Sequence, residues 1–358
     1  MNNYNGNYNP NGQFGGWGQG AYGGYNAPYY NYYNEQYQKQ QEKKNDKKIL
    51  RTMGNWFGFA IICFIVLQLI VGTIIGLLSG VFSKLNLLYD DDNVSMAYQI
   101  IASVFFILVP FVIAYVALKK KKIAGILPFG TPYNAKAAVG LTMFCVPLMI
   151  FSTFAINLIS AVFQEAIGIT FTTGFEDPKI VSAEGIFIAV LSTAVLPAVI
   201  EEFIIRGVVM QPLRRFGDKF AIVASALIFG IMHGNMVQIP YTLVAGLFFG
   251  YLVVATGSIW PSIILHFINN FYSVAVLAVY DNAGDSVGAT VSALFIGLFV
   301  ISGIIGGLIY FPMNYKTPLK KGVNTLKTGE KFSALFVNVP MIFAIIFLLL
   351  QTIGTIKF

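Results

Sequence analysis

The sequence predicts an all-α fold: a polytopic bundle of eight or nine transmembrane helices, preceded by a disordered N-terminal tail. Three observations predict this fold. Of the 358 residues, 56% are hydrophobic and only 11% are charged, whereas soluble domains carry about a quarter charged residues. Long apolar runs follow one another from residue 49 to the C-terminus. The basic residues gather before the first run and between the second and third, the fourth and fifth, and the eighth and ninth runs.

The first element is a polar tail over residues 1–48, rich in Asn, Gly, Tyr and Gln. It contains tyrosines but almost no aliphatic side chains, so it cannot bury enough apolar surface to offset the entropy of ordering. We therefore expect this tail to be disordered and to lie on the cytoplasmic side.

The apolar runs are long enough for helices that cross a bilayer, which takes about 20 residues at about 1.5 Å each. Backbone groups in lipid must be satisfied internally, so helices are the expected structure. The shorter pair over 220–256 could be partly re-entrant, which leaves the count between eight and nine. The predicted spans are 54–82, 96–118, 137–163, 185–210, 220–236, 238–256, 260–280, 288–311 and 333–355.

Basic clusters give the orientation of these spans. With nine spans, all clusters fall on one side, which the positive-inside rule makes cytoplasmic, and the net charge of +7 then reflects topology instead of a nucleic-acid partner. We expect an integral protein of the cell membrane, with lipid as its surroundings and its N-terminus in the cytoplasm. The clusters are Lys39–Arg51, Lys119–Lys122 with Lys136, Arg214–Lys219, and Lys316–Lys331.

A few polar side chains interrupt the apolar runs, and ionisable groups at bilayer depth are candidates for function by default. Both histidines of the chain belong to this set. Counted from the ends of their runs, Glu201, His233 and Asn270 fall in overlapping layers about 15–20 Å from the cytoplasmic face, with His266 somewhat shallower. The whole set is Glu201, Glu202 and Arg206 in the fourth run, His233 in the fifth, and His266 and Asn270 in the seventh.

Helical spacing indicates how these groups pair. Glu202 and Arg206 are four residues apart and share a helix face, so one carboxylate can be neutralised. Glu201 is rotated by about 100° from its neighbour and is free to point elsewhere. His266 and Asn270 share a face in the same way. Phe229 lies four residues before His233, and we interpret it as a wall of the pocket.

These groups suit hydrolysis of a peptide bond, which needs an activated water and donors for the developing oxyanion. A carboxylate and a neutral histidine can hold the water, and a second histidine with an asparagine can donate to the oxyanion. Glu201, His233 and His266 are also residue types that bind a catalytic divalent metal such as zinc, although no HExxH motif is present. The sequence leaves both versions open.

Three motifs in this order resemble the CPBP intramembrane proteases, the family related to type II CAAX prenyl proteases and to bacteriocin-processing and immunity proteins. The motifs are EExxxR, FxxxH and HxxxN. They stand here as Glu201–Arg206, Phe229–His233 and His266–Asn270, each on its own apolar run. The resemblance covers residues 185–280 convincingly and does not reach the N-terminal tail.

The resemblance implies a cavity open to the cytoplasm, with Glu201 as the general base and His233 holding the attacking water. It further implies an oxyanion site of His266 and Asn270, shaped by Glu202 and Arg206. The expected substrate is a membrane-associated, prenylated or leader-type peptide. The expected organisation is a tail (1–48), N-terminal spans (49–180), a catalytic core (181–282) and C-terminal spans (283–358).

Two other functions compete with an intramembrane endopeptidase. A catalytically silent immunity or scaffold member of the same family would be expected to lose a motif residue, yet all are present. An ion-coupled transporter could use intramembrane Glu, His and Arg as a relay. Internal repeats with paired broken helices would favour a transporter, and none is apparent.

Overall fold

The computed structural model describes residues 27–84, 100–174, 179–315 and 317–357. The described chain is built from helices, with one two-stranded antiparallel sheet of β1 (Thr170–Phe171) and β2 (Ile356–Lys357). The predicted all-α class is confirmed. Two units are distinguished, Met1–Glu42 and Lys43–Phe358. The first contributes the beginning of α1, whose described side chains are exposed and include an ion pair between Glu35 and Lys39 at 3.9 Å.

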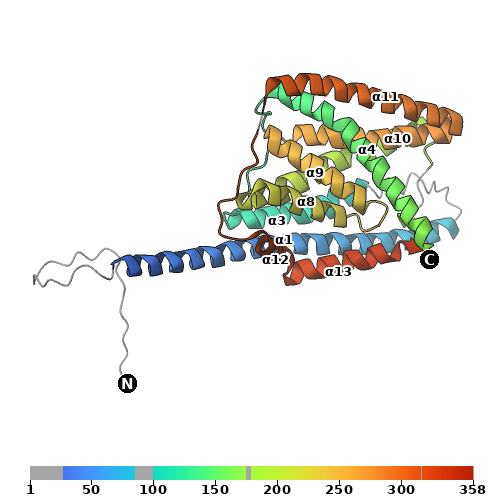
Figure 1. The fold of residues 1–358 in the computed structure, drawn as a ribbon. Helices are drawn as coiled ribbons and strands as arrows, with labels where there is room; N and C mark the ends of the chain where they lie inside the picture. Colours follow the sequence, from blue (N-terminus) through green and yellow to red (C-terminus); the bar gives the residue numbers. More distant parts are fainter. Residues whose placement is uncertain (1–26, 85–99, 175–178, 316, 358) are drawn as a thin grey trace, which may run out of the picture. The chain divides into compact units, whose positions relative to one another are not determined.

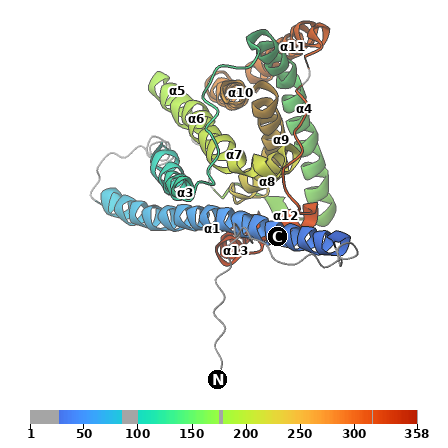
Figure 2. The same ribbon diagram turned by 90° about the vertical axis from the view of Figure 1, so that its left-hand side faces the viewer.

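Apart from the beginning of α1, all described helices lie in the unit Lys43–Phe358 (Figures 1 and 2). Several are joined end to end through π-helical turns at Ala102–Leu108, Val190–Val195 and Phe203–Val209 or 3-10 turns at Arg214–Phe216 and Phe311–Met313. The α-helices are α1 (Ala27–Lys84), α3 (Val109–Lys120), α4 (Ala135–Ile167), α5 (Ala183–Ala189), α6 (Leu196–Glu202), α7 (Met210–Leu213), α8 (Asp218–Ile231), α9 (Ile239–Thr256), α10 (Trp260–Ala283), α11 (Asp285–Tyr310), α12 (Thr328–Phe336) and α13 (Val339–Gly354).

The polar tail differs from its prediction. Helix α1 begins at Ala27, so residues 27–48 are helical where disorder was expected, and residues 1–26 lie outside the described chain. Residues 35–48 are mostly Gln, Glu and Lys, which are good helix formers. Because the apolar span that follows already provides a helical nucleus, adding these residues avoids the cost of a new nucleation step.

The number of membrane spans is also lower than predicted. Within the described residues, six helices are long and apolar enough to cross a membrane, or seven if the bent pair α12–α13 counts as one span. The predicted count of eight or nine is therefore not confirmed. The run predicted over 220–236 forms α8, whose 14 residues extend about 21 Å, against a hydrocarbon thickness of about 30 Å. The helical segment 100–120 is not among the six either, and residues 85–99 before it are not described.

Local sequence explains where the helices begin and end. Asn134 caps α4, its side chain accepting a hydrogen bond from the backbone of Ala137 at 3.0 Å. Gly168 ends the same helix with φ of 70°, a left-handed conformation that glycine adopts without strain. Pro240 and Pro261 stand in the first turns of α9 and α10, where no intrahelical amide bond is lost.

Helices α8 and α9 form a hairpin whose two open ends lie at the same end of the bundle. Asp218, the first residue of α8, accepts a hydrogen bond from the backbone of Lys320, and Thr317 donates to the carbonyl of Ala255 near the end of α9. Small residues allow the two helices to approach closely. A Cβ built on Gly246 would lie 3.0 Å from that of Ala226. Because α8 is only 14 residues long, it is shorter than the thickness of a bilayer core, and the turn over residues 232–238 follows it directly.

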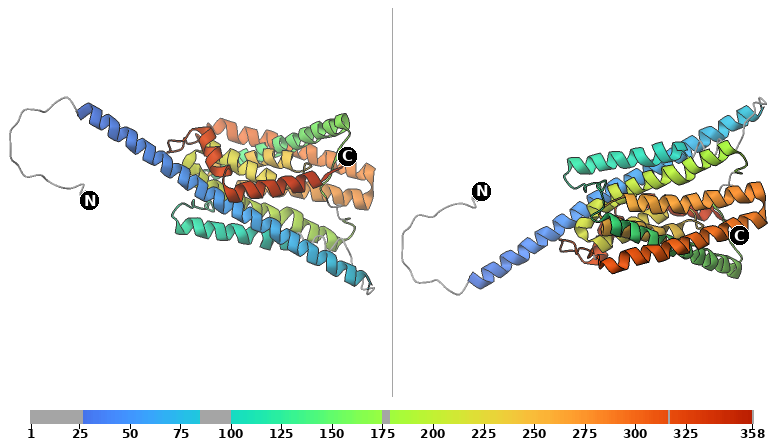
Figure 3. Two further views of the ribbon diagram at one scale, coloured as in Figure 1. Left: turned by 90° about the horizontal axis from the view of Figure 1, so that it is seen from below. Right: turned by 90° about the horizontal axis from the view of Figure 1, so that it is seen from above.

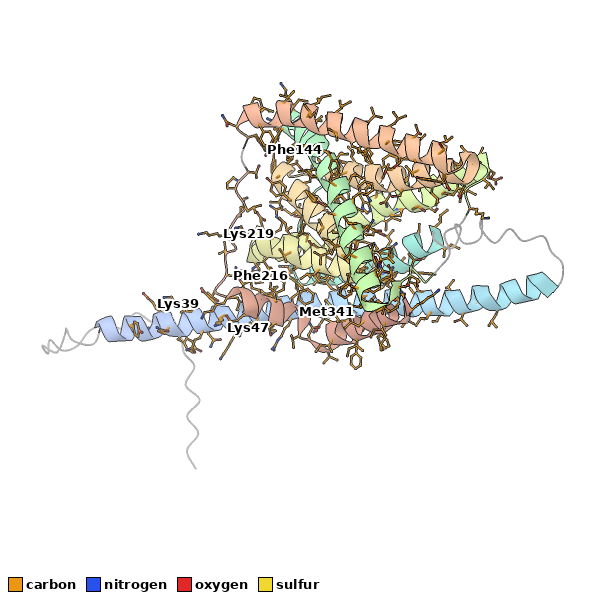
Figure 4. The ribbon with its side chains drawn as sticks, turned by 45° about the vertical axis from the view of Figure 1, so that its right-hand side comes forward. Lys39, Lys47, Phe144, Phe216, Lys219 and Met341 are labelled. Atoms are coloured by element: carbon orange, nitrogen blue, oxygen red, sulfur yellow. The ribbon has the colours of Figure 1, made fainter. Side chains whose placement is uncertain are left out.

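Basic residues that are far apart in the sequence meet at one end of the bundle. Lys47 and Lys43 of α1 contact Glu330 at 3.0 and 2.9 Å, and the Lys331 ammonium donates to the carbonyl of Phe216 at 2.7 Å. Figure 4 shows Lys47, Phe216 and Lys219 at this end. The opposite end carries the β1–β2 pair and Asp281, which accepts from the backbone of Ile180. Three of the four predicted basic clusters thus meet at one end, through residues 43–47, 215–218 and 320–331.

Candidate active site

The two neighbouring glutamates lie on the long helix that runs from α5 to α7, seen in line in Figure 2. They are the last residues of α6, immediately before the π-helical turn Phe203–Val209. Turns of this kind inside α-helices are frequent at functional sites, because the wider turn redirects the side chains around it. Glu202 is fully buried, whereas the side chain of Glu201 retains 20% of its exposure. The two carboxylates therefore have different surroundings, as the rotation between them predicts.

Glu202 and Arg206 form a buried ion pair. Glu202 Oε1 lies 3.1 Å from Arg206 Nη1, and both side chains have no exposed surface. Arg206 Nη2 also donates to the carbonyl of Gly246 on α9 at 3.1 Å. The guanidinium packs over the rings of Phe229 and Phe249, at 4.7 and 5.1 Å from their centres. The predicted pairing of Glu202 with Arg206 is observed. Through Arg206 it links the helix that carries both glutamates, from α5 to α7, to the α8–α9 hairpin.

His266 lies between the two glutamates. Its Nδ1 is 3.2 Å from Glu202 Oε1, and its Nε2 is 3.9 Å from Glu201 Oε2. An ionised carboxylate only accepts hydrogen bonds, so Nδ1 carries the proton of this contact. The imidazole is buried and stacks on Phe249 at 4.8 Å. The ring is therefore held with Nε2 toward Glu201, while Glu202 supports any positive charge that the ring acquires.

His233 stands on the turn between α8 and α9. Its Nδ1 lies 2.8 Å from the carbonyl oxygen of Phe229, which can only accept, so Nδ1–H donates. Nε2 is then the free nitrogen of a neutral ring. The nearby groups whose charges act on this histidine are Glu201, His266 and Arg206. Five of the predicted residues thus share one neighbourhood, and Phe229 packs against both imidazoles as the predicted wall.

The side chain of Asn270 is held by residues outside the group of glutamates and histidines. Its side-chain Nδ2 donates to the carbonyl of Thr193 at 2.9 Å, in the π-helical turn Val190–Val195, and its Oδ1 accepts from Asn269 at 3.0 Å. One proton of the Asn270 amide thus joins α10 to the helix that carries both glutamates. The second proton of the same amide is the one left for an oxyanion. The side chain is half-buried.

One of three comparisons with known proteins found a match. Residues 183–272 match the family model described as type II CAAX prenyl endopeptidase Rce1-like. This segment is an Rce1-like domain. It makes up about a quarter of the chain and contains all seven predicted site residues, so the resemblance to the CPBP family is confirmed over this segment. Searches of the curated proteins and of the solved structures gave no match.

A metal centre is not assembled in the Rce1-like domain. Both imidazoles donate Nδ1–H to an oxygen and keep Nε2 free, the orientation that metal-bound histidines adopt, but the same orientation serves to bind water. Among the described residues, no three His, Cys, Asp or Glu side chains are grouped so that they could hold one ion. The donor set does not fit zinc as arranged, and a divalent metal at Glu201, His233 and His266 stays a prediction.

Two residues of α9 contribute to the site without having been predicted. Phe249 stacks on His266, and Gly246 offers its carbonyl to Arg206. Both are ordinary residues of an apolar helix in the sequence, so neither composition nor spacing singled them out. Their spacing of three residues places them on one face of α9, but only the packing of α9 against α8 shows which face this is.

Proposed function

We propose that the protein is an intramembrane endopeptidase, in which Glu201 activates a water molecule that attacks a peptide bond. The substrate is a membrane-associated peptide of the prenylated or leader type. One observation carries the proposal: a partly exposed carboxylate and two oriented imidazoles occur together on three elements of an integral membrane protein. The Rce1-like domain that contains them supports protease chemistry.

In the proposed first step, Glu201 takes a proton from water while the water oxygen bonds to the carbonyl carbon of the substrate. The unprotonated Nε2 of His233 accepts a hydrogen bond from the same water and directs it. The carbonyl oxygen becomes an oxyanion, which accepts from the remaining amide proton of Asn270 and from Nε2–H of protonated His266. Glu202 stabilises this imidazolium through Nδ1, much as a carboxylate orients a catalytic histidine.

In the second step the tetrahedral intermediate collapses and the bond from carbon to nitrogen breaks. The proton that Glu201 took from water passes to the departing amine, so the enzyme returns to its initial state. Of the two acids, only Glu201 suits this role. Its side chain is reachable, whereas Glu202 is fully buried and engaged by Arg206 and His266.

We further propose that the N-terminus and the basic end of the bundle face the cytoplasm at the cell membrane. The support is the meeting of Lys43, Lys47, Arg215 and Lys331 at one end, together with the positive-inside rule. A substrate peptide would then reach Glu201 from the cytoplasmic side.

The decisive experiment compares membrane peptides from cells that express the wild type, Glu201→Gln or Glu184→Gln. Glu184 is exposed near the start of the same helix and serves as the matched control. We expect peptides that accumulate with the wild type and the control and are lost with Glu201→Gln, with cleavage reduced by at least about 100-fold. Full cleavage by Glu201→Gln would reject the assigned base. If cells with the wild type and cells without the protein contain the same membrane peptides, the endopeptidase is rejected and a silent scaffold or a transporter is favoured.

A further inference from the structure

The turn that carries His233, over residues 232–238, has non-helical backbone in a chain whose helices are long and apolar enough to span a membrane. Within a bilayer such backbone is tolerated only where protein covers it or where it lines a water-filled space. The turn satisfies part of its own backbone, because the Asn235 side chain donates to the carbonyl of His233 at 2.9 Å and accepts from the backbone of Gln238 at 2.9 Å. Gly234 lies between them with φ of 62°, a left-handed conformation that bulkier side chains rarely adopt.

The other side of this turn is covered by the C-terminal helix. A Cβ atom built on Gly234 would lie 2.8 Å from both Cδ and Nε2 of Gln351, so the Gln351 amide rests on the glycine that follows His233. Gln351 lies in α13, near the end of an otherwise apolar run. Gln351 is exposed on its outer side, and its amide contacts the turn on the other.

Helix α13 is held in this position by α1. A Cβ on Gly58 of α1 would meet the backbone of Pro340 and Met341, which shows that the two helices are in backbone contact. Figures 1 and 2 both show α13 alongside α1, and Figure 4 labels Met341 there. The side chain of Met341 is fully buried. Because both helices lie outside residues 183–272, this support is an addition to the Rce1-like domain.

We propose that Gln351 is a positioning residue for His233. Its amide fills the space over Gly234 and prevents the turn from tilting away from Glu201, while the Phe229 carbonyl fixes the ring at Nδ1. The role in catalysis rests on the proposed function. The contact itself does not, because it fixes the orientation of His233 whether or not a peptide is cleaved.

The chain has only two histidines, so the contact can be tested without a substrate. The full-length protein is labelled with ¹⁵N-histidine, and the imidazole nitrogen signals are recorded in lipid nanodiscs, with His266→Gln used to assign them. We expect Gln351→Ala to shift or broaden the signals of His233 and to leave those of His266 in place. Gln351→Met, which preserves the length of the side chain, should restore most of the wild-type His233 signal.

Ile353→Ala is the matched control, since Ile353 is a lipid-exposed neighbour on the same helix, 58% exposed. It should leave both histidines unchanged. The His266 signals report whether each variant has folded. Unchanged His233 signals in Gln351→Ala would overturn the inference, and so would an equal shift in Ile353→Ala.

The kinetic arm uses a peptide identified by the peptidome comparison. Gln351→Ala should lower kcat by about tenfold and leave KM within about twofold, because it disturbs the orientation of a catalytic group and not substrate binding. In a His233→Ala background it should have no further effect. Additive losses would overturn the positioning role. Absence of cleavage by the wild type would overturn the proposed function alone, and the histidine signals would still decide the contact.

Discussion

At the scale of single residues, the site depends on a buried charge pair that is shared by several partners. Glu202 is contacted by Arg206 and by His266, and Arg206 also donates to the carbonyl of Gly246. Neither charged side chain has any exposed surface. Removing one member of such a pair leaves an uncompensated charge away from water, whereas replacing both removes the charges together.

This arrangement predicts an order of stability among variants. Arg206→Met should lower the free energy of unfolding by about 3–5 kcal/mol, because Glu202 is left buried without its counter-ion. The double variant Glu202→Gln with Arg206→Met should recover a large part of that loss. Its glutamine oxygen still accepts from His266 Nδ1, and no net charge remains buried. Thermal unfolding in detergent measures both.

A double variant that is less stable than Arg206→Met would contradict the proposed electrostatic role of the pair. Both variants should cleave slowly even when folded, because the carboxylate that supports the His266 imidazolium is either displaced or gone. Cleavage at the wild-type rate by the folded double variant would show that His266 does not act as a cation.

At the scale of the elements, the α8–α9 hairpin determines where the site is assembled. It carries His233 and Phe229 on one helix and its turn, and Gly246 and Phe249 on the other. In Figure 3 the yellow helices of this hairpin lie among the other helices of the bundle. The close approach of the two helices at Gly246 is what brings a backbone carbonyl within reach of Arg206.

Enlarging Gly246 should therefore separate the hairpin from the site. In Gly246→Val the first added carbon alone would lie 3.0 Å from Cβ of Ala226, and the branch has no space. We expect a loss of about 1–3 kcal/mol in stability, as for other overpacked cores, together with a marked loss of cleavage. Gly297→Val in α11 is the control, since no atom lies within 4 Å of the added carbon. Equal effects of the two substitutions would count against a special role of the hairpin.

Sequence reasoning identified the residues of the site better than it identified the elements that hold them. Glu201, Glu202 and Arg206 were recognisable because charges are rare in apolar runs and their spacing fixes their faces. The role of Gln351 was not recognisable. Its contact with Gly234 joins positions more than 100 residues apart and depends on how α13 packs. The shortness of α8 was hidden because the apolar run continues through Met236 and Val237, where the backbone is no longer helical.

At the scale of the whole molecule, the parts added to the Rce1-like domain are tied to it at the basic end of the bundle. Within the unit Lys43–Phe358, Glu330 at the start of α12 accepts from Lys43 and Lys47 of α1. Asp46 of α1 lies 3.8 Å from Arg215, which immediately precedes Phe216 and the start of α8. The ion pairs thus join α1, α12 and the beginning of the hairpin, at the opposite end of α13 from Gln351.

The ion pairs at Glu330 predict a pH dependence of stability. Hydrogen bonds from Lys43 and Lys47 lower the pKa of Glu330 from its ordinary value of 4.5 to about 2. A carboxyl whose pKa is lower in the folded protein contributes its full stabilisation above the unfolded pKa and loses it as the pH falls toward the folded one. The contribution should therefore be constant above about pH 5 and decline between about pH 4.5 and 2.

Glu330→Gln should accordingly lower the thermal midpoint relative to the wild type at pH 7, and the difference should shrink as the pH approaches 2. Added salt at about 1 M should also reduce the difference at pH 7, because these groups are only partly shielded from solvent. Glu42→Gln, at an exposed position of α1, should show no such pH-dependent difference. If the Glu330→Gln difference persists unchanged at pH 2, the ion pairs with α1 are not what holds α12 against it.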